Sequence, residues 1–286
     1  MILVAGATGN LGREVMKHLT GYGADHEVSI LARDTAKAEH YARLGIPVRI
    51  ADYDQPDTLP QAFAGVSKLL LISTMSMNRA EQQKRVVDAA VAAGVGHILY
   101  TGLAIRDIET SAVRDLMISH FETENHIRNS GVAWTFLRNT MYAEALPVII
   151  GAPAAGGAII LSGGDGQVPY ASRAEMGEAA ANVLLQTGHE GKTYEITGAQ
   201  AWSYDEVAMA LTAAKGRNFT YQDIDPDTHR RVLESLNLPP FLIDLTIGTV
   251  EDIRKGQYDI ASDDLQRLLG RAPTPLPALL PDLFPN

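Results

Sequence analysis

Short hydrophobic runs alternate along the first half of the chain with longer segments whose apolar residues recur at helical spacing. The runs are almost continuously apolar, as expected of parallel strands that are covered on both faces. They lie at 2–7, 27–33, 47–53, 68–73, 97–102 and 133–139. The helical patterns lie at 11–21, 35–44, 79–93 and 112–129, with a shorter helix over 56–64. This alternation predicts an α/β fold with a Rossmann-type, doubly wound parallel sheet.

The alternation breaks after Asn139. Residues 145–167 are rich in Gly and Pro and predict loops around a short strand. Further elements follow: a helix at about 172–187, strands at 192–198 and 219–224, a helix at 203–215, and a largely helical tail from Pro226. We assign 1–150, together with the 172–187 helix, to the sheet domain. The remainder of 151–286 is expected to form a smaller C-terminal α/β cap over the carboxyl edge of the sheet.

The composition excludes several classes of protein. The net charge of −10 opposes binding to nucleic acid or to an anionic membrane surface. The chain contains no run of about eighteen apolar residues, so no membrane-spanning helix is predicted. The chain has no cysteine, which removes disulfides and thiolate metal sites and fits a cytoplasmic location. The eight histidines lack ligand spacing, so no metal site is expected.

The first predicted strand ends in the glycine-rich stretch GATGNLG, residues 6–12, which leads directly into a helix. In such a motif one glycine permits the tight turn, one lets the backbone approach a pyrophosphate, and one allows close packing of helix and strand. We assign these roles to Gly6, Gly9 and Gly12 in turn. The helix N-terminus would hold the phosphates of a dinucleotide, with Thr8, Asn10 and Leu11 in the same loop. The alternative is a tight structural turn with no ligand.

The end of the second predicted strand indicates which dinucleotide binds. An acidic residue there holds the ribose 2′-OH of NAD, whereas an arginine accommodates the 2′-phosphate of NADP. Arg33 ends this strand and Lys37 follows one turn later, so we predict NADP(H). In the alternative, Arg33 is a solvated strand end and Asp34 takes the ribose.

Ligands of such folds lie across the carboxyl ends of the strands, which nominates further contacts along one crevice. They are Asp52 and Tyr53 near the adenine, Ser73, Thr74 and Met75 near the ribose, and Thr101 with the two residues after it near the nicotinamide.

Several motifs together resemble the NmrA-like branch of the atypical short-chain dehydrogenase/reductases. They are GATGNLG, LARDTAKA, ADYDQPDTL, AAGVGHILYTG, HFETENHIRNSGVAWTFLRNTMYAE and GHEGKTYEITG, so the resemblance covers almost the whole chain. Within that branch the chain is most similar to bacterial NAD(P)H:quinone oxidoreductases, with the triphenylmethane dye reductases nearby. The resemblance implies an NADPH-dependent reductase of quinones. It also implies that the loop of Asn139, Thr140, Met141 and Tyr142 touches the cofactor.

Short-chain dehydrogenases usually protonate a carbonyl with a Tyr that is followed four residues later by a Lys. The helix expected to carry this pair reads SAVRDLMISHFETENHIRNSG, with neither residue, which argues against alcohol–ketone chemistry. A quinone needs less, because the arriving hydride produces a resonance-stabilised oxyanion. His120 and Glu124, four residues apart, are candidates for polar help in the crevice, the alternative being a surface pair.

Asn139 and Tyr142, at and just after the end of the strand predicted over 133–139, complete the candidate catalytic set. In the alternative, Tyr142 packs under the cap. Arg138 is expected to be structural. We therefore expect direct hydride transfer from NADPH to a stacked quinone, without flavin.

Two other functions stay open: reduction of another electron-poor acceptor such as a cationic dye, and non-catalytic sensing of NADP(H) for a regulatory partner. A homodimer is left open as the oligomeric state.

Overall fold

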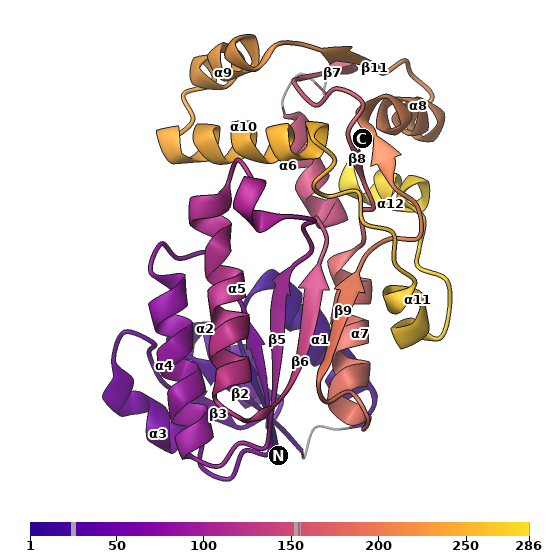
Figure 1. The fold of residues 1–286 in the computed structure, drawn as a ribbon. Coiled ribbons are helices and arrows are strands. Elements are labelled where there is room, and N and C mark those ends of the chain that lie inside the picture. The colour runs from indigo at the N-terminus through magenta and orange to yellow at the C-terminus, as the bar shows by residue number, and fades with distance from the viewer. Residues whose placement is uncertain (24–26, 152–153, 155, 286) are drawn as a thin grey trace.

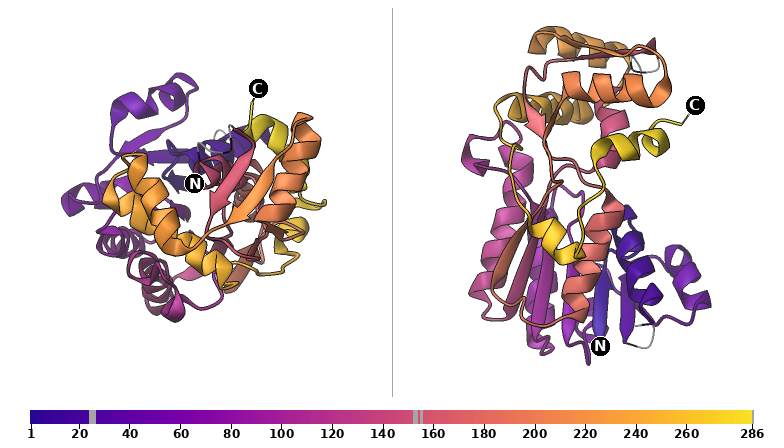
Figure 2. Two further views of the ribbon diagram at one scale, coloured as in Figure 1. Left: turned by 90° about the horizontal axis from the view of Figure 1, so that it is seen from above. Right: turned by 90° about the vertical axis from the view of Figure 1, so that its right-hand side faces the viewer.

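The computed structural model describes residues 1–23, 27–151, 154 and 156–285. The chain forms a central sheet with helices on both faces and a smaller cap above the carboxyl ends of the strands (Figure 1). Figure 2 shows the same arrangement from two other directions, with the N-terminus at the end of the sheet that lies away from the cap. Part of the Gly- and Pro-rich segment predicted as loops falls outside the described residues.

The central sheet has seven strands, all parallel, in the order β3-β2-β1-β4-β5-β6-β9. The strands are β1 (Ile2–Ala5), β2 (Val28–Ala32), β3 (Val48–Ile50), β4 (Lys68–Ile72), β5 (His97–Leu103), β6 (Ala133–Asn139) and β9 (Lys192–Ile196). The order reverses at β1, where β2 lies on one side and β4 on the other. The chain connections on the two sides of β1 therefore run in opposite directions and leave a crevice at the carboxyl ends of the strands. Open α/β sheets bind their ligands in this crevice.

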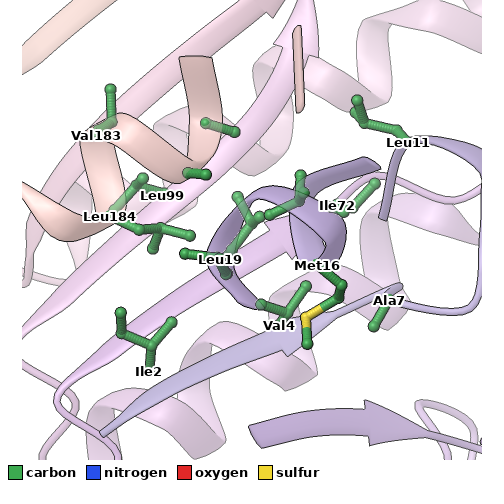
Figure 3. Packing of buried hydrophobic residues seen from close by; sticks show 14 of the residues in the cluster. Ile2, Val4, Ala7, Leu11, Met16, Leu19, Ile72, Leu99, Val183 and Leu184 are labelled. Carbon is green, nitrogen blue, oxygen red and sulfur yellow. The ribbon is translucent and has the colours of Figure 1, made fainter. Parts of the chain in front are cut away.

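Two helical layers cover the sheet on both faces, which explains why β1, β2, β4 and β5 are buried and almost continuously apolar. One layer contains α1 (Asn10–Gly21), α2 (Thr35–Arg43), α7 (Arg173–Leu185) and α11 (Asp264–Leu269). The other contains η1 (Pro56–Thr58), α3 (Leu59–Ala62), α4 (Arg79–Ala92) and α5 (Arg114–Asn129). Figure 3 shows the first core, where Val4 of β1 lies close to Met16 and Leu19 of α1.

The cap has its own hydrophobic core, which includes Leu146, Leu161 and Val250. Its elements before residue 200 are η3 (Ala143–Ala145), α6 (Leu146–Ile150), β7 (Ala158–Leu161) and β8 (Gln167–Val168). Those after it are β10 (Trp202–Ser203), α8 (Tyr204–Lys215), β11 (Thr220–Asp223), α9 (Pro226–Ser235), α10 (Pro240–Arg254) and α12 (Leu276–Leu283). Two small sheets, β10 with β8 and β11 with β7, join the separated segments.

A short loop between β5 and α5, containing η2 (Ile108–Thr110), is held by the end of α10. The carboxylate of Asp252, which is wholly buried, accepts hydrogen bonds from the Ser111 hydroxyl at 2.5 Å and from the backbone N–H of Ala112 at 2.7 Å. Two donors on one buried carboxylate fix the cap against the loop that follows β5.

The boundary expected at residue 150 needs correction. The strand over 192–196, assigned from the sequence to the cap, is the seventh strand of the central sheet and pairs with β6 through Thr135↔Lys192 and Asn139↔Ile196. Leu265 and Leu268 of α11 also pack in the core of the sheet domain. The chain therefore returns from the cap to the sheet domain at α7 and β9 and again at α11, so the cap is not one continuous segment.

The contact between α1 and α7 depends on a small residue. A Cβ added at Gly177 would lie 2.7 Å from Cβ of Glu14 and 2.9 Å from the backbone nitrogen of Val15. We expect Gly177→Ala to lower the free energy of unfolding by about 1–3 kcal/mol, because overpacking separates the two helices. Urea unfolding measures this. Gly21→Ala is the control: nothing lies within 4 Å of that added Cβ, so its stability should not fall. Equal losses in both variants would contradict the packing argument.

Candidate functional site

The glycine-rich loop joins β1 to α1 in a geometry that only glycine permits. Gly6 has φ +90°, which L side chains rarely adopt. A Cβ added at Gly12 would lie 2.1 Å from the carbonyl oxygen of Gly6 and 2.6 Å from Cα of Ala7. The first turn of α1 is therefore packed directly on the loop that precedes it, as the motif predicts.

The N-terminus of α1 carries no capping side chain. Its N-cap is Gly9, and the intrahelical bonds start with Arg13 N–H donating to the Gly9 carbonyl at 3.0 Å. The N–H groups of the preceding first-turn residues therefore point out of the helix end, together with the positive end of its dipole. This arrangement suits the phosphates of a bound nucleotide.

A pocket of about 550 Å³, named here the strand-end pocket, opens at the carboxyl ends of β1, β2, β3 and β4. Predicted cofactor contacts supply much of its lining: Gly6, Thr8, Arg33, Lys37, Asp52, Tyr53, Thr74 and Met75. Leu31, Ala32, Asp34, Ala51, Asp54, Ser76 and Gln82 complete it. The fold thus brings together residues from four separate strand ends.

Arg33 and Asp34, the two candidate ribose contacts at the end of β2, have different surroundings. Asp34 is the N-cap of α2, and its Oδ1 accepts a hydrogen bond from the backbone N–H of Ala36 at 2.8 Å. Arg33 is exposed and lines the strand-end pocket beside Lys37. Because one oxygen of the Asp34 carboxylate already serves the cap, whereas Arg33 and Lys37 line the pocket together, this arrangement favours Arg33 and a 2′-phosphate over Asp34 and a free ribose hydroxyl.

The wall of the pocket after β3 is fastened to α4. Oδ1 of Asp52 accepts from the backbone N–H of Asp54 at 3.0 Å, and Gln82 Nε2 donates to Oδ2 of Asp54 at 2.8 Å. The Arg85 guanidinium donates to the carbonyl of Tyr53 at 3.3 Å. The Tyr53 ring packs against the core of that face and lines the pocket, so it offers a fixed aromatic surface.

The ends of β4 and β6 carry two buried hydroxyls that lack partners in the described part of the chain: Thr74 Oγ1 and Thr140 Oγ1. An unpaired buried hydroxyl costs free energy, so each is a group that a bound ligand can satisfy. Thr101, by contrast, is buried and accepts from the backbone N–H of Ser73 at 3.0 Å, so its side chain ties β4 to β5.

The loop after β6 divides its residues between the two parts of the molecule. Met141 packs against the core of the cap, whereas Tyr142 packs against the sheet-domain core, with the Arg173 guanidinium 4.4 Å from the centre of its ring. Burial raises the pKa of the Tyr142 hydroxyl, and a hydrogen bond with Asn139 opposes that shift. Tyr142 is therefore a neutral hydrogen-bond donor at physiological pH.

His120 lies within a buried polar network between α4, β5 and α5. Its side chain is 6% exposed, and its Nδ1 lies 3.0 Å from the Tyr100 hydroxyl, which donates to Oε1 of Gln83 at 3.0 Å. Burial, and secondly the charge of Arg79, lower the pKa of His120 well below its usual range. His120 is consequently neutral and is engaged with Tyr100 inside this network. The polar help expected of it in the crevice stays a prediction.

Glu124 forms a buried ion pair rather than facing the crevice with His120. It is 1% exposed, and its two carboxylate oxygens accept from Nε and Nη2 of Arg138 at 2.9 and 2.7 Å. The two residues are thus not a surface pair, and each has its own partner inside the protein. The structural role expected of Arg138 holds, since it joins α5 to β6 and also lies 3.4 Å from Glu195 of β9.

Arg79 is a buried residue that the sequence analysis missed. It is 2% exposed, and it donates to the carbonyls of Thr74 at 3.1 Å and Leu116 at 2.6 Å and to the Ser119 hydroxyl at 2.9 Å. All three acceptors are neutral, and burial lowers the pKa of its guanidinium. Arg79 fixes the loop after β4, which lines the pocket, to the first turns of α5. An arginine in a helical pattern gives no signal of this burial.

Comparison with known proteins places this geometry in a family. Residues 1–258 match the model of the NmrA-like family. The chain belongs to the NmrA-like family.

Its relatives include quinone oxidoreductase 2 of Escherichia coli, 38% identical over 99% of each chain, and NAD(P)H azoreductase of Xenophilus azovorans, 32% identical over 85% of this chain and 84% of that protein. Two solved structures superpose with a TM-score of 0.91 at 37% identity, covering 99% of this chain and all of the other. They are the E. coli quinone oxidoreductase complexed with NADPH and the Citrobacter sp. triphenylmethane reductase complexed with NADP(H).

This NmrA-like protein keeps the Rossmann-type sheet but has neither Tyr nor Lys on α5, as the sequence indicated. In place of a proton relay, α5 carries the buried groups His120, Thr123 and Glu124. Among the described residues, no cluster of His, Asp or Glu is arranged to hold a metal ion, and no helix has the length and apolar character needed to cross a membrane.

The neutral state of His120 predicts a pH dependence of stability. The unfolded chain takes up a proton on this residue below pH of about 6.5, whereas the folded chain does not. Acid therefore favours the unfolded state, by up to about 1.4 kcal/mol per pH unit from this group. In urea unfolding at pH 7.5 and 5.5, His120→Gln should lose less stability on acidification than the wild type. If wild type and His120→Gln differ in free energy of unfolding by the same amount at pH 7.5 and at pH 5.5, the proposed role of His120 in the pH dependence is wrong.

Proposed function

We propose that this protein is an NADPH-dependent quinone oxidoreductase that transfers hydride directly to a quinone. The observation that carries the proposal is the strand-end pocket, where a glycine-rich helix start meets Arg33 and Lys37. Its support from the comparisons is the similarity over the whole chain to a quinone oxidoreductase whose structure is known with NADPH.

The described residues fit NADPH at each part of its length. The pyrophosphate suits the uncapped start of α1 at Gly9, Asn10, Leu11 and Gly12, and the 2′-phosphate suits Arg33 and Lys37. The loop of Asp52 and Tyr53 suits the adenine. Toward the nicotinamide, Thr74 and Thr140 offer buried hydroxyls that are otherwise unpaired.

Bound NADPH supplies a hydride from C4 of its reduced ring. The protein then needs to hold the quinone against that ring and stabilise the oxygen that becomes negative. We assign the second role to Asn139 and to the neutral Tyr142 hydroxyl at the end of β6. A donor suffices there, because the charge of a reduced quinone is delocalised and its oxygen takes its proton from water. This explains how the enzyme works without the Tyr–Lys pair.

A dye or azo acceptor is a second candidate substrate, because triphenylmethane reductase and NAD(P)H azoreductase are among the relatives. The net charge of −10 would favour a cationic dye, more so at low ionic strength. We also propose a cytoplasmic location, since a chain without cysteine suits a reducing compartment. A homodimer stays a prediction.

The direct-transfer step is tested by oxidation of NADPH with 1,4-benzoquinone and no added flavin. We expect acceptor-dependent loss of absorbance at 340 nm and a primary isotope effect with only one of the two C4-deuterated forms of NADPH. One-sided transfer is expected because a ring bound in a single orientation would present only one of its faces to the acceptor. Replacing benzoquinone by a cationic triphenylmethane dye in the same assay ranks the two candidate substrates.

Gly12→Val is the control, because any Cβ at this position meets the Gly6 carbonyl and should prevent cofactor binding. Turnover that requires added flavin would reject the direct mechanism. NADPH binding shown by calorimetry, without turnover of any quinone or dye, would favour the sensing function instead.

Tyr142→Phe tests the assigned donor. Removal of its hydroxyl should lower kcat with benzoquinone roughly tenfold, the loss expected for one hydrogen bond of about 1.4 kcal/mol, and leave the KM for NADPH unchanged. Steady-state kinetics measures both. Phe retains the ring contact with Arg173 but loses the hydrogen bond with Asn139, so urea unfolding of the variant is measured beside its kinetics. An unchanged kcat would show that Tyr142 is a packing residue only.

A further inference from the structure

A second pocket, of about 850 Å³, lies between α1 and α2 and is named here the α1–α2 pocket. Its basic lining residues are Arg13, Lys17, Lys37 and His40, and the others are Thr8, Gly9, Met16, Thr20, Tyr41 and Leu44. Within the described part of the chain it has no carboxylate in its lining. In a protein of net charge −10, such a concentration of positive groups favours an anionic ligand.

The α1–α2 pocket and the strand-end pocket share a wall. Thr8 and Lys37 line both, whereas Arg33 lines only the strand-end pocket and Arg13 only the α1–α2 pocket. An anion held beside Arg33 and Lys37 therefore lies at the junction of the two pockets. The 2′-phosphate is the part of NADPH that belongs at this junction, because it projects from the adenosine ribose next to the end of β2.

Arg13 is anchored to the glycine-rich loop. Its Nε donates to the carbonyl of Thr8 at 3.1 Å, which uses one of the five N–H donors of the guanidinium. Its two terminal amino groups lie beyond this bond and can form the paired contacts that suit a phosphate. The Tyr41 hydroxyl donates to the carbonyl of Ala7 at 2.9 Å, which holds α2 against the same loop. Arg13 on α1 and Tyr41 on α2 are thus both bonded to one short segment, which holds together the two helices that line this pocket.

We propose that Arg13 is a third cationic contact of the NADPH 2′-phosphate, which it approaches from the α1–α2 pocket while Arg33 and Lys37 approach from the strand-end pocket. Arg13 is then a residue that determines cofactor specificity, although it lies in the glycine motif and not at the end of β2. This inference rests on the proposed function only for the identity of the cofactor, since it concerns the phosphate and not the acceptor.

The test measures binding of 2′,5′-ADP and of 5′-AMP by calorimetry to the wild type, Arg13→Ala and Arg13→Lys. Arg13→Ala should weaken 2′,5′-ADP tenfold to a hundredfold and change 5′-AMP less than twofold, and Arg13→Lys should keep part of the affinity. Arg43→Ala is the matched control. It also removes one positive charge, but Arg43 is an exposed residue of α2 outside both pockets, paired with Glu39, so its effect should stay below twofold.

Equal weakening of both nucleotides by Arg13→Ala would overturn the proposal and place Arg13 at the phosphate that both nucleotides carry. An unchanged affinity for 2′,5′-ADP would overturn it as well. Neither nucleotide needs a quinone, so this result is separate from the test of the proposed function. Failure of quinone turnover with intact selectivity for 2′,5′-ADP would reject the acceptor and leave the role of Arg13 standing.

Discussion

The close contact between Gly12 and the carbonyl of Gly6 is the constraint on which the candidate site depends. Because Gly12 has no Cβ, the first turn of α1 packs directly against the backbone of Gly6 and Ala7, just after the end of β1. The uncapped helix end is thereby placed at the reversal of strand order, between the ends of β2 and β4. Every other cofactor contact is defined relative to this fixed point, because parallel strands bring their carboxyl ends to the same edge.

Local charge at this edge differs from the charge of the whole chain. The chain is acidic, yet the junction of the two pockets gathers Arg13, Arg33 and Lys37 from α1, the end of β2 and α2. Asp34, which directly follows Arg33, uses one carboxylate oxygen to cap the N-terminus of α2. An ordinary helix cap thereby engages one oxygen of the acidic side chain next to Arg33.

In this protein α5, which has neither residue of the Tyr–Lys pair, connects other elements of the sheet domain. Glu124 with Arg138 and His120 with Tyr100 fasten α5 to β6 and β5, and Arg79 fastens its first turns to the loop after β4. These buried polar groups are costly unless paired, and their pairing holds the crevice walls at fixed positions. Hydride transfer to an acceptor that stabilises its own negative charge mainly requires that the protein hold cofactor and acceptor in the correct relative orientation.

The sequence by itself determined the elements and the cofactor end of the site. Six strands and their helices follow from local periodicity, and the glycine motif and the end of β2 are recognisable because turn geometry and charge are properties of neighbouring residues. Tertiary structure alone decided the rest. It placed β9 in the central sheet, buried Glu124 against Arg138, made His120 neutral, left Arg79 among neutral acceptors, and brought Arg13 beside Lys37. Each of these outcomes depends on which side chain from a distant part of the chain lies opposite, and periodicity carries no information about that partner.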